Sequence, residues 1–321
     1  MNGLVRRSFL SIAAAGLAAP AAFAQTRAEW AAVGQYGDKA APVTLFERDG
    51  ALHLFGKDLP VARLTALGGG RYAVAGGGEV ALETGAVRLN GTRLAFHDFG
   101  AETQAAIHAA VRADPAALRQ RALAATPPVE TEAHLPADLV DLTAIDPRIR
   151  LDIRYAGSNN FMGIPLYERA AAWLQRPAAE ALGRVQHALA GKGFGLLIHD
   201  AYRPWFVTWM FWEATPPESH AFVADPAKGS RHNRGCAVDL TLYDLKTGKP
   251  VEMPSRYDEF SDRAYADFIG GTTQQRALRA MLRDAMTAEG FEVYSEEWWH
   301  FDYRDWRRYG IGTKTFTALA G

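Results

Sequence analysis

Short runs in which apolar and polar residues alternate dominate the chain between residues 42 and 96. Alternation with a period of two is the pattern of strands that bury one face. Asp49-Gly50 and Asn90-Gly91 separate such runs, and these dipeptides are typical of tight hairpin turns. The pattern therefore predicts a small antiparallel β domain.

Helical spacing follows this β region, over residues 103–111 and 116–124. Residues 126–138 are then polar and rich in proline, as linkers often are. We therefore predict a β-rich N-terminal domain with a helical tail over residues 25–125. The linker covers 126–138, and a second domain covers 139–321.

The second domain combines strand-like and helix-like periodicity without a repeating strand–helix–strand order. That combination favours an α+β fold. The expected strands cover residues 149–155, 195–199, 237–243 and 291–294, and the expected helices cover 170–189 and 274–289.

Composition narrows the function classes. The 321 residues are 48% hydrophobic, which is enough to bury the cores of two domains. Their formal net charge is −1, and without a dense stripe of basic residues nucleic-acid binding is not expected. Cys236 is the only cysteine, so no intrachain disulfide forms. A nucleophilic cysteine needs a base and an orienting group, and we expect Cys236 to be a small, half-buried filler instead.

The first 24 residues have the features of a signal peptide: a charged start, an apolar stretch from Phe9 to Ala19, and Ala-Phe-Ala at 22–24. The apolar stretch is too short for a membrane span. Arg-Arg-Ser-Phe-Leu at 6–10 resembles a twin-arginine signal, which exports folded proteins. The alternative is an ordinary signal peptide that happens to contain two arginines. Both predict a periplasmic or other extracytoplasmic protein whose mature form has no transmembrane segment.

The segment from Ser230 to Thr241 carries the first candidate site. In a strand that starts near Ala237, Asp239 lies on the face opposite to the apolar residues. A buried carboxylate is costly unless it is paired or binds a cation, and His232 lies a short turn upstream. Taken alone, this pair is also explained by a structural hydrogen bond.

A second segment, from Glu297 to His300, supplies another imidazole and another carboxylate. Two histidines and one carboxylate leave a coordination position open on zinc, which a catalytic site needs for a water molecule. Glu297 is then the natural general base. In a flat strand Glu297 and His300 point to opposite faces, so a turn or bulge must bring them together. The alternative is an aromatic edge with solvated acids.

Arg203 follows the expected buried strand at 195–199, at a position from which loop residues reach a cleft. A fixed guanidinium there would stabilise the negative charge that develops on the oxygen of a carbonyl under attack. An arginine before a proline also commonly forms a surface salt bridge, and this alternative stays open.

With these pieces, residues 139–309 resemble the D-alanyl-D-alanine dipeptidases, a family of zinc peptidases. Five motifs in order are more specific than any one of them alone. They are Asp152-Ile153-Arg154-Tyr155, Asn159-Asn160-Phe161-Met162-Gly163, Asp200-Ala201-Tyr202-Arg203-Pro204, Ser-x-His-x-x-Gly-x-x-x-Asp at 230–239, and Glu297-Trp298-Trp299-His300.

The resemblance implies a role for each matching residue. His232, Asp239 and His300 would hold one zinc ion per chain. Glu297 would be the catalytic base, and Arg203 would stabilise the tetrahedral intermediate. The implied fold is a compact α+β domain around a central antiparallel sheet, of the zinc D,D-peptidase and hedgehog-like type, preceded here by the small all-β domain.

Two further residues are implied on the substrate side. Asp258 would meet the free ammonium of a dipeptide, although it also fits a plain turn residue. Ser230 would hydrogen-bond either the substrate or the histidine loop. Two features depart from the family pattern: the β domain is not part of it, and Cys236 stands where a small hydroxyl residue is common.

The expected activity is zinc-dependent hydrolysis of D-alanyl-D-alanine to two D-alanines. A zinc D,D- or L,D-carboxypeptidase or endopeptidase acting on longer peptidoglycan peptides is the nearest alternative. A non-catalytic, zinc-stabilised module that binds cell wall is the alternative from another class. The expected partner is thus a dipeptide or a peptide derived from peptidoglycan, and the oligomeric state does not follow from the sequence.

Overall fold

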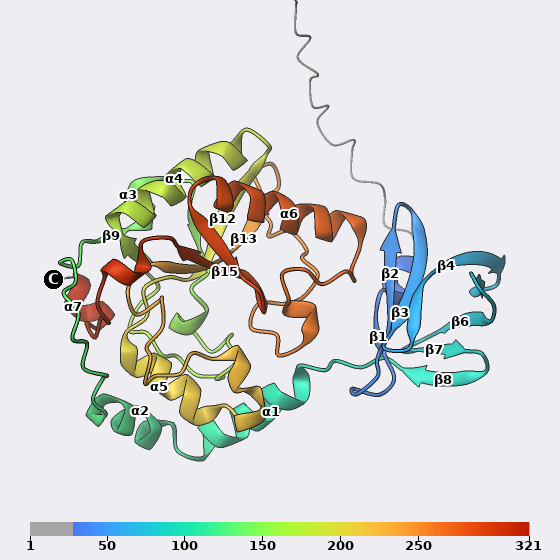
Figure 1. The fold of residues 1–321 in the computed structure, drawn as a ribbon, viewed down its shortest axis with the longest axis horizontal. Helices are drawn as coiled ribbons and strands as arrows, with labels where there is room; N and C mark the ends of the chain where they lie inside the picture. Colours follow the sequence, from blue (N-terminus) through green and yellow to red (C-terminus); the bar gives the residue numbers. More distant parts are fainter. Residues whose placement is uncertain (1–27, 321) are drawn as a thin grey trace, which may run out of the picture.

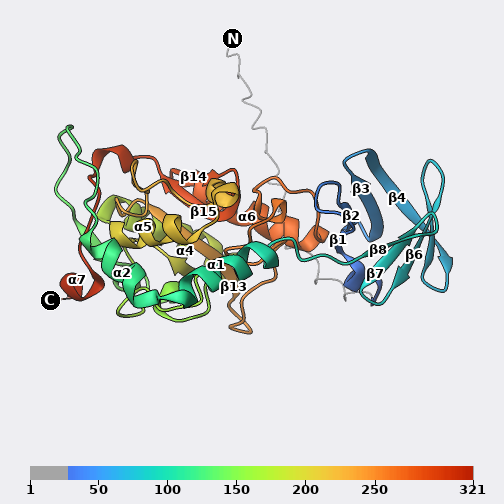
Figure 2. The ribbon, with the colours of Figure 1, turned by 90° about the horizontal axis from the view of Figure 1, so that it is seen from below.

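The computed structural model describes residues 28–320, so the predicted signal peptide lies outside the described residues. A β domain and a larger mixed domain lie side by side along the longest axis of the molecule (Figures 1 and 2). None of the helices in the described range is long and apolar enough to cross a membrane.

The N-terminal domain is an antiparallel meander of eight strands that follow one another in chain order. The meander closes into a barrel, because Gly37 N–H donates to the carbonyl of Ala95 (2.9 Å) and His97 N–H donates to that of Gln35 (3.0 Å). The strands are β1 Gly34–Tyr36, β2 Val43–Arg48, β3 Ala51–Gly56, β4 Leu59–Gly68, β5 Arg71–Val74, β6 Glu79–Glu83, β7 Ala86–Leu89 and β8 Thr92–Ala95, after a 3-10 turn at Ala28–Ala32.

The predicted hairpin turns of the barrel are confirmed. Asp49 and Gly50 link β2 to β3 with φ angles of 51° and 76°, and Asn90 and Gly91 link β7 to β8 with 49° and 84°. Two successive residues of positive φ match the twist of a β-hairpin, and Asn, Asp and Gly tolerate that conformation best. The predicted small all-β domain is therefore present.

Two helices connect the barrel to the larger domain: α1 (Ala101–Ala113) and α2 (Pro115–Ala124). Asp114 caps α2 by accepting a hydrogen bond from Ala117 N–H at 2.8 Å. The apolar faces of both helices, including Ile107 and Leu118, lie in the core of the larger domain. The two helices that the sequence assigned to the tail of the N-terminal domain therefore pack as part of the second domain and not as part of the barrel.

A five-stranded sheet organises the larger domain, in the order β10-β12-β13-β15-β14. All its pairs are antiparallel except that of β10 with β12, which confirms the expected α+β architecture. Its strands are β10 Arg150–Leu151, β12 Phe194–Asp200, β13 Ala237–Asp244, β14 Phe291–Tyr294 and β15 Glu297–Tyr303.

Helices cover this sheet from two sides (Figure 1). Helices α4 and α6 pack against the sheet, and α5 lies on the other side beside α1 and α2. The helices are α3 Leu142–Ile145, α4 Arg176–Ala190, α5 Trp205–Ala214, α6 Thr273–Ala288 and α7 Phe316–Ala320, and a small second sheet pairs β9 Leu139–Asp141 with β11 Trp173–Gln175.

Two expected elements differ from the structure. The strand predicted over residues 149–155 is only β10, because after Leu151 the chain leaves the sheet and makes a 3-10 turn at Arg154–Ala156. The helix predicted over 170–189 begins later, after β11, where Pro177 occupies the first turn of α4. Proline suits that position because its nitrogen carries no hydrogen, and the first helical N–H groups have no partner within the helix.

Candidate metal centre and active site

Three predicted ligands meet at one point on the sheet. Asp239 on β13 and His300 on β15 are direct neighbours across the antiparallel pair. His232 reaches them from the loop before β13, and one ligand atom from each residue lies within 4.8 Å of the others. His232 Nε2 and His300 Nδ1 are 3.1 Å apart, and Asp239 Oδ1 is 3.2 Å from the first and 3.0 Å from the second.

The outward-facing nitrogen of each histidine is already engaged. His232 Nδ1–H donates to the carbonyl of Ala201 at 2.6 Å, and His300 Nε2–H donates to Asp302 Oδ1 at 2.9 Å. Such contacts set the tautomer and the ring orientation of metal-binding histidines. The remaining nitrogens and the Asp239 carboxylate converge, so this set of donors fits a divalent metal ion.

Charges within the cluster shift two of these groups in opposite directions. Burial acts to raise the pKa of Asp239, but the charge of His232 and hydrogen bonds from both histidines hold it well below its usual range. Burial acts to lower the pKa of His300, but Asp302 and Asp239 raise it well above its usual range. Without a metal, the site therefore favours imidazolium paired with carboxylate, and a bound cation replaces that proton.

A bulge in β15 brings Glu297 to the same site. Val293 on β14 pairs with Phe301, but the next residue, Tyr294, pairs with Glu297, so extra residues of β15 loop out between the two pairs. The predicted bulge is therefore confirmed, and Glu297 Oε2 lies 3.8 Å from His300 Nδ1. Burial raises the pKa of Glu297 to about 8, which gives this carboxylate a high affinity for a proton.

Arg203 is buried beside the cluster, with 7% of its surface exposed. Its Nε–H donates to Asp200 Oδ2 at 2.9 Å, and a terminal nitrogen forms an ion pair with the same oxygen at 2.7 Å. Asp200 is itself fully buried and also accepts a hydrogen bond from Tyr167. The guanidinium packs over the ring of Phe211, 4.6 Å from its centroid. This burial excludes the surface salt bridge that the sequence left open.

Asp258 lines the same pocket from the long segment between β13 and α6. Its φ angle of 57° places it in a left-handed turn, and its carboxylate accepts hydrogen bonds of 3.0 Å at both oxygens from the Tyr155 hydroxyl. Burial, followed by the charges of Asp239 and Glu297, raises the pKa of Asp258 well above its usual range. A cation bound in the pocket close to Asp258 would stabilise the ionised form of this carboxylate and lower its pKa.

Ser230 and Cys236 have structural roles near the site. Ser230 is buried in the pocket wall, and its Oγ accepts a hydrogen bond from His232 N–H at 3.2 Å, so of its two expected contacts the one to the histidine loop is present. Cys236 is fully buried in the core and not half-buried as the sequence led us to expect. Burial raises the pKa of its thiol to about 12, which keeps the thiol protonated near neutral pH and unsuited to nucleophilic attack.

Two residues that contact the candidate ligands, Asp302 and Tyr257, were not predicted from the sequence. Asp302 lies two residues beyond His300 on the same strand face, and this spacing is a signal that could have found it. Tyr257 donates from its hydroxyl to Asp239 Oδ2 at 2.9 Å. No local pattern in the sequence links the segment of Tyr257 to β13, so this contact had no signal.

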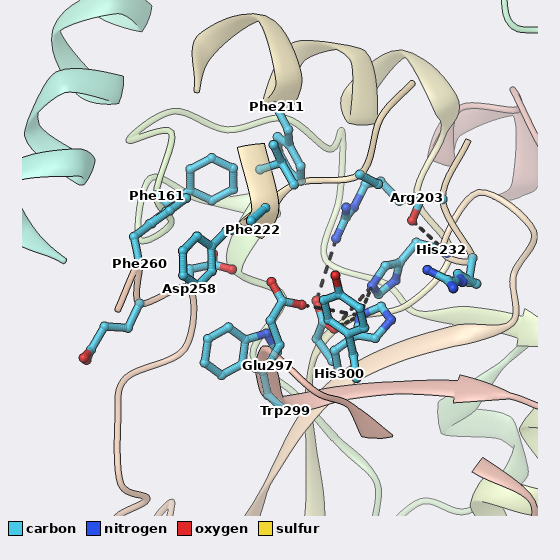
Figure 3. Close-up of a pocket in the computed structure, with 18 of the residues that line it drawn as sticks. Phe161, Arg203, Phe211, Phe222, His232, Asp258, Phe260, Glu297, Trp299 and His300 are labelled. Carbon is cyan, nitrogen blue, oxygen red and sulfur yellow. Dashed lines mark hydrogen bonds and ion pairs between the residues drawn. The ribbon is translucent and has the colours of Figure 1, made fainter. Parts of the chain in front are cut away.

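The pocket above the candidate metal ligands is small and has one aromatic side. Its cavity volume is about 100 Å³. Figure 3 shows His232, His300 and Arg203 on one side, Asp258 and a group of phenylalanines on the other, and Glu297 between them. The aromatic residues of the lining are Tyr155, Phe161, Phe211, Phe222, Phe260, Tyr294 and Trp299.

The larger domain is similar in sequence to known proteins. A family model described as D-Ala-D-Ala dipeptidase matches residues 136–311, more than half of the chain. This chain belongs to that family. It is 36% identical over 182 residues to the D-alanyl-D-alanine dipeptidase of Escherichia coli (strain K12), covering 57% of this chain and 93% of that protein. It is also 36% identical over 178 residues to the D-alanyl-D-alanine dipeptidase of Enterococcus faecium, covering 49% of this chain and 87% of that protein.

Membership of the dipeptidase family makes the protein a metallopeptidase, which confirms the predicted family and decides against a non-catalytic module. The cluster of His232, Asp239 and His300 offers this dipeptidase-family enzyme a possible site for its metal. The matched region starts after the barrel and after α1 and α2, so these elements lie outside the family pattern.

Replacement of Asp302 by asparagine is expected to weaken metal binding by about 10- to 100-fold, because such partners of metal-binding histidines typically contribute that much. Asp302→Asn keeps the shape of the side chain but loses the charge that holds His300 Nε2–H. Competition with a chromogenic chelator measures the affinity. Asp305→Asn, at an aspartate whose carboxylate lies 3.9 Å from Arg308, is the control, and equal affinity in the two variants would show that Asp302 does not orient His300.

Proposed function

We propose that this peptidase hydrolyses D-alanyl-D-alanine to two D-alanines with one zinc ion per chain. The observation that carries the proposal is Asp258, a carboxylate with a raised pKa in a cavity of about 100 Å³ that also contains the metal ligands. A pocket of this size, with the Asp258 carboxylate opposite the proposed metal ligands, matches a short substrate with a free ammonium group. The names of the relatives support the same substrate.

The choice of zinc rests on the donor set. Two imidazoles and one carboxylate suit zinc, and three protein ligands are the usual number for catalytic zinc. His232 Nε2, His300 Nδ1 and Asp239 Oδ1 would hold the ion. The chemistry that bound zinc supplies is a lower pKa for a water molecule and polarisation of a carbonyl group.

Glu297 is the proposed general base. Its carboxylate lies beside the ligand cluster and has a pKa raised to about 8. It takes a proton from the attacking water and passes this proton to the nitrogen of the leaving amine, which are the two proton transfers that amide cleavage needs. Burial makes the protonated form accessible near neutral pH, so the second transfer is not disfavoured.

Arg203 stabilises the negative charge that develops on the carbonyl oxygen. Its hydrogen bond and ion pair with buried Asp200 hold the guanidinium in place, so little reorganisation is needed during the reaction. By analogy with donors of oxyanion holes, such a group contributes about 2.7–4 kcal/mol.

The proposed location is the periplasm or another extracytoplasmic compartment. The support is the signal-like sequence of residues 1–24 with its twin-arginine pattern. There the substrate would be a free dipeptide or a small fragment of peptidoglycan. Export is tested by the position of the mature N-terminus after expression with the complete leader.

Asp258→Asn is expected to lower kcat/KM for D-Ala-D-Ala by about 100-fold, because loss of one partner of a buried charge pair costs several kcal/mol. The variant and wild type are assayed for alanine release from D-Ala-D-Ala and from its N-acetylated form. Wild type should cleave the acetylated form poorly, and Asp258→Asn should lose this discrimination. Asp267→Asn, at an exposed aspartate of the same segment, should behave as wild type.

Efficient cleavage of N-acetylated or longer peptides by wild type would contradict the dipeptidase proposal. It would favour a carboxypeptidase or endopeptidase acting on longer peptidoglycan peptides.

A further inference from the structure

One side of the active-site pocket is formed by a long irregular segment, residues 251–272, which we call the wall segment. Its only regular element is the 3-10 turn Asp262–Ala264. It lines the pocket with Asp258, Glu259 and Phe260. Loops of this length without secondary structure are uncommon in compact domains and depend on contacts with their surroundings for a fixed conformation.

Within the wall segment, the buried carboxylate of Glu259 holds the turn that presents Asp258. Glu259 accepts hydrogen bonds from Ser261 Oγ (2.7 Å) and Arg256 N–H (3.1 Å), and it lies 3.4 Å from the Arg263 guanidinium. Asp258 itself has a positive φ of 57°. A non-glycine residue in this conformation persists only where the surrounding contacts determine it.

The barrel and its connection to α1 touch the wall segment directly. Gln35 on β1 donates to Asp262 Oδ1 at 3.0 Å. Gly100, just after the barrel, lies so close that a Cβ atom there would be 3.2 Å from the Glu259 side chain. Asp98 pairs with Arg256, but the Arg256 side chain is 61% exposed, and exposed ion pairs contribute little.

A stronger contact lies where the wall segment ends and α6 begins. Glu47 on β2 is only 3% exposed, and its carboxylate accepts a hydrogen bond from Thr273 N–H at 2.7 Å. Its backbone N–H donates to the carbonyl of Gly271 at 3.0 Å, and Arg276 donates to its carbonyl at 2.7 Å. A carboxylate at the first turn of a helix also complements the positive end of the helix dipole.

Between these contacts the two domains are not continuously packed. A cavity of about 410 Å³ separates them, lined by Gln35 and Thr44 of the barrel and by Pro254, Phe268 and Thr272 of the wall segment. The barrel therefore contacts the wall segment and the start of α6 at separate points. Among the barrel residues that make these contacts, Gln35 and Glu47 are the most buried. Loss of one point leaves the segment free to shift.

We propose that the barrel is a positioning element for substrate recognition: through Glu47 it fixes the wall segment and with it the carboxylate of Asp258. This inference rests on the proposed function, because it assigns to the barrel a share in the recognition of the dipeptide ammonium. Glu47 acts only through Asp258 and does not touch the substrate. The barrel, which lies outside the family match, thereby raises selectivity for short substrates with a free amine.

The test is Glu47→Gln in the full-length protein. KM for D-Ala-D-Ala is expected to rise on the order of tenfold with kcat within about twofold, because a small misplacement of a binding group costs this much or more. Cleavage of the N-acetylated dipeptide and the zinc content should not change. Glu83→Gln, which breaks ion pairs with Arg88 and Arg93 within the barrel, is the matched control and should leave KM as in wild type.

A double-mutant cycle separates positioning from a general loss of structure. In the Asp258→Asn background, Glu47→Gln should add no further rise in KM. An additional rise of the same size would overturn the inference, as would an unchanged KM in the single variant. If Glu47→Gln does not fold, Asp262→Ala removes the hydrogen bond that the Asp262 carboxylate accepts from Gln35 and should raise KM in the same direction, whereas an unchanged KM would overturn the inference.

Failure of the proposed function has a different signature. If Asp258→Asn itself leaves the discrimination between free and acetylated dipeptide intact, then Asp258 is not the amine site, and both proposals fall together. If Asp258→Asn abolishes discrimination and the barrel variants do not alter it, only the inference about the barrel falls.

Discussion

Glu297→Gln is expected to lower kcat for D-Ala-D-Ala by about 1,000-fold while zinc stays bound, because general-base catalysis contributes up to about 10⁴-fold. Glutamine keeps the size of the side chain and its place in the β15 bulge but cannot take a proton from water. The loss should appear in kcat, since Glu297 is assigned to proton transfer and not to substrate binding. Steady-state kinetics with measured zinc content provide the test.

Glu296→Gln is the matched control, because Glu296 is the preceding residue, is not in the pocket lining, and accepts a hydrogen bond from Ser295 Oγ at 2.6 Å. Its kcat should equal that of wild type. A Glu297→Gln enzyme that keeps more than about a tenth of wild-type kcat would assign the proton transfers to another group, since the expected loss is far larger.

Removal of a metal ligand should have an effect at least as large. His232→Ala is expected to lose stoichiometric zinc and to reduce kcat/KM by about 1,000-fold or more, because a metal ion supplies several kcal/mol of transition-state stabilisation. Elemental analysis after gel filtration measures the zinc. His187→Ala, at an exposed histidine of α4, should keep both zinc and activity. Full activity in zinc-free His232→Ala would refute the ligand assignment.

The same site should bind zinc more weakly as the pH falls. The pKa of His300 in the metal-free protein is raised well above its usual range, so its imidazole carries a proton that zinc must displace. Lower pH strengthens this competition. Calorimetric titrations in two buffers of different ionisation enthalpy should therefore reveal proton release on binding.

The sequence predicted the elements with regular periodicity best. β13 and α6 lie within a residue or two of the predicted ranges, because one alternates apolar and polar positions and the other repeats them with helical spacing. The helical spacing of α1 and α2 showed which faces are apolar but not which core would bury them. That choice depends on contacts such as those of α5 with α2, which no local pattern encodes.

Some residues of the candidate site could also be predicted from the sequence, and others could not. His232, Asp239 and His300 could be predicted because their residue types suit a metal and because the five motifs resemble a known family. The bulge at Glu297 could be predicted from the need to bring two opposite faces together. The contact of Tyr257 with Asp239 and the docking of Glu47 on α6 could not, since both join segments that are distant in the chain and lack any periodic pattern.

Cys236, the only cysteine, is sealed in the core and forms no covalent cross-link. Maturation of the enzyme therefore needs no oxidant and no disulfide isomerase. On the proposed export route, the chain would complete its folding, assemble the three proposed ligands and dock the barrel in the reducing cytoplasm. A route that carries folded cargo, as proposed from residues 6–10, would then deliver an enzyme whose active site was built before it crossed the membrane.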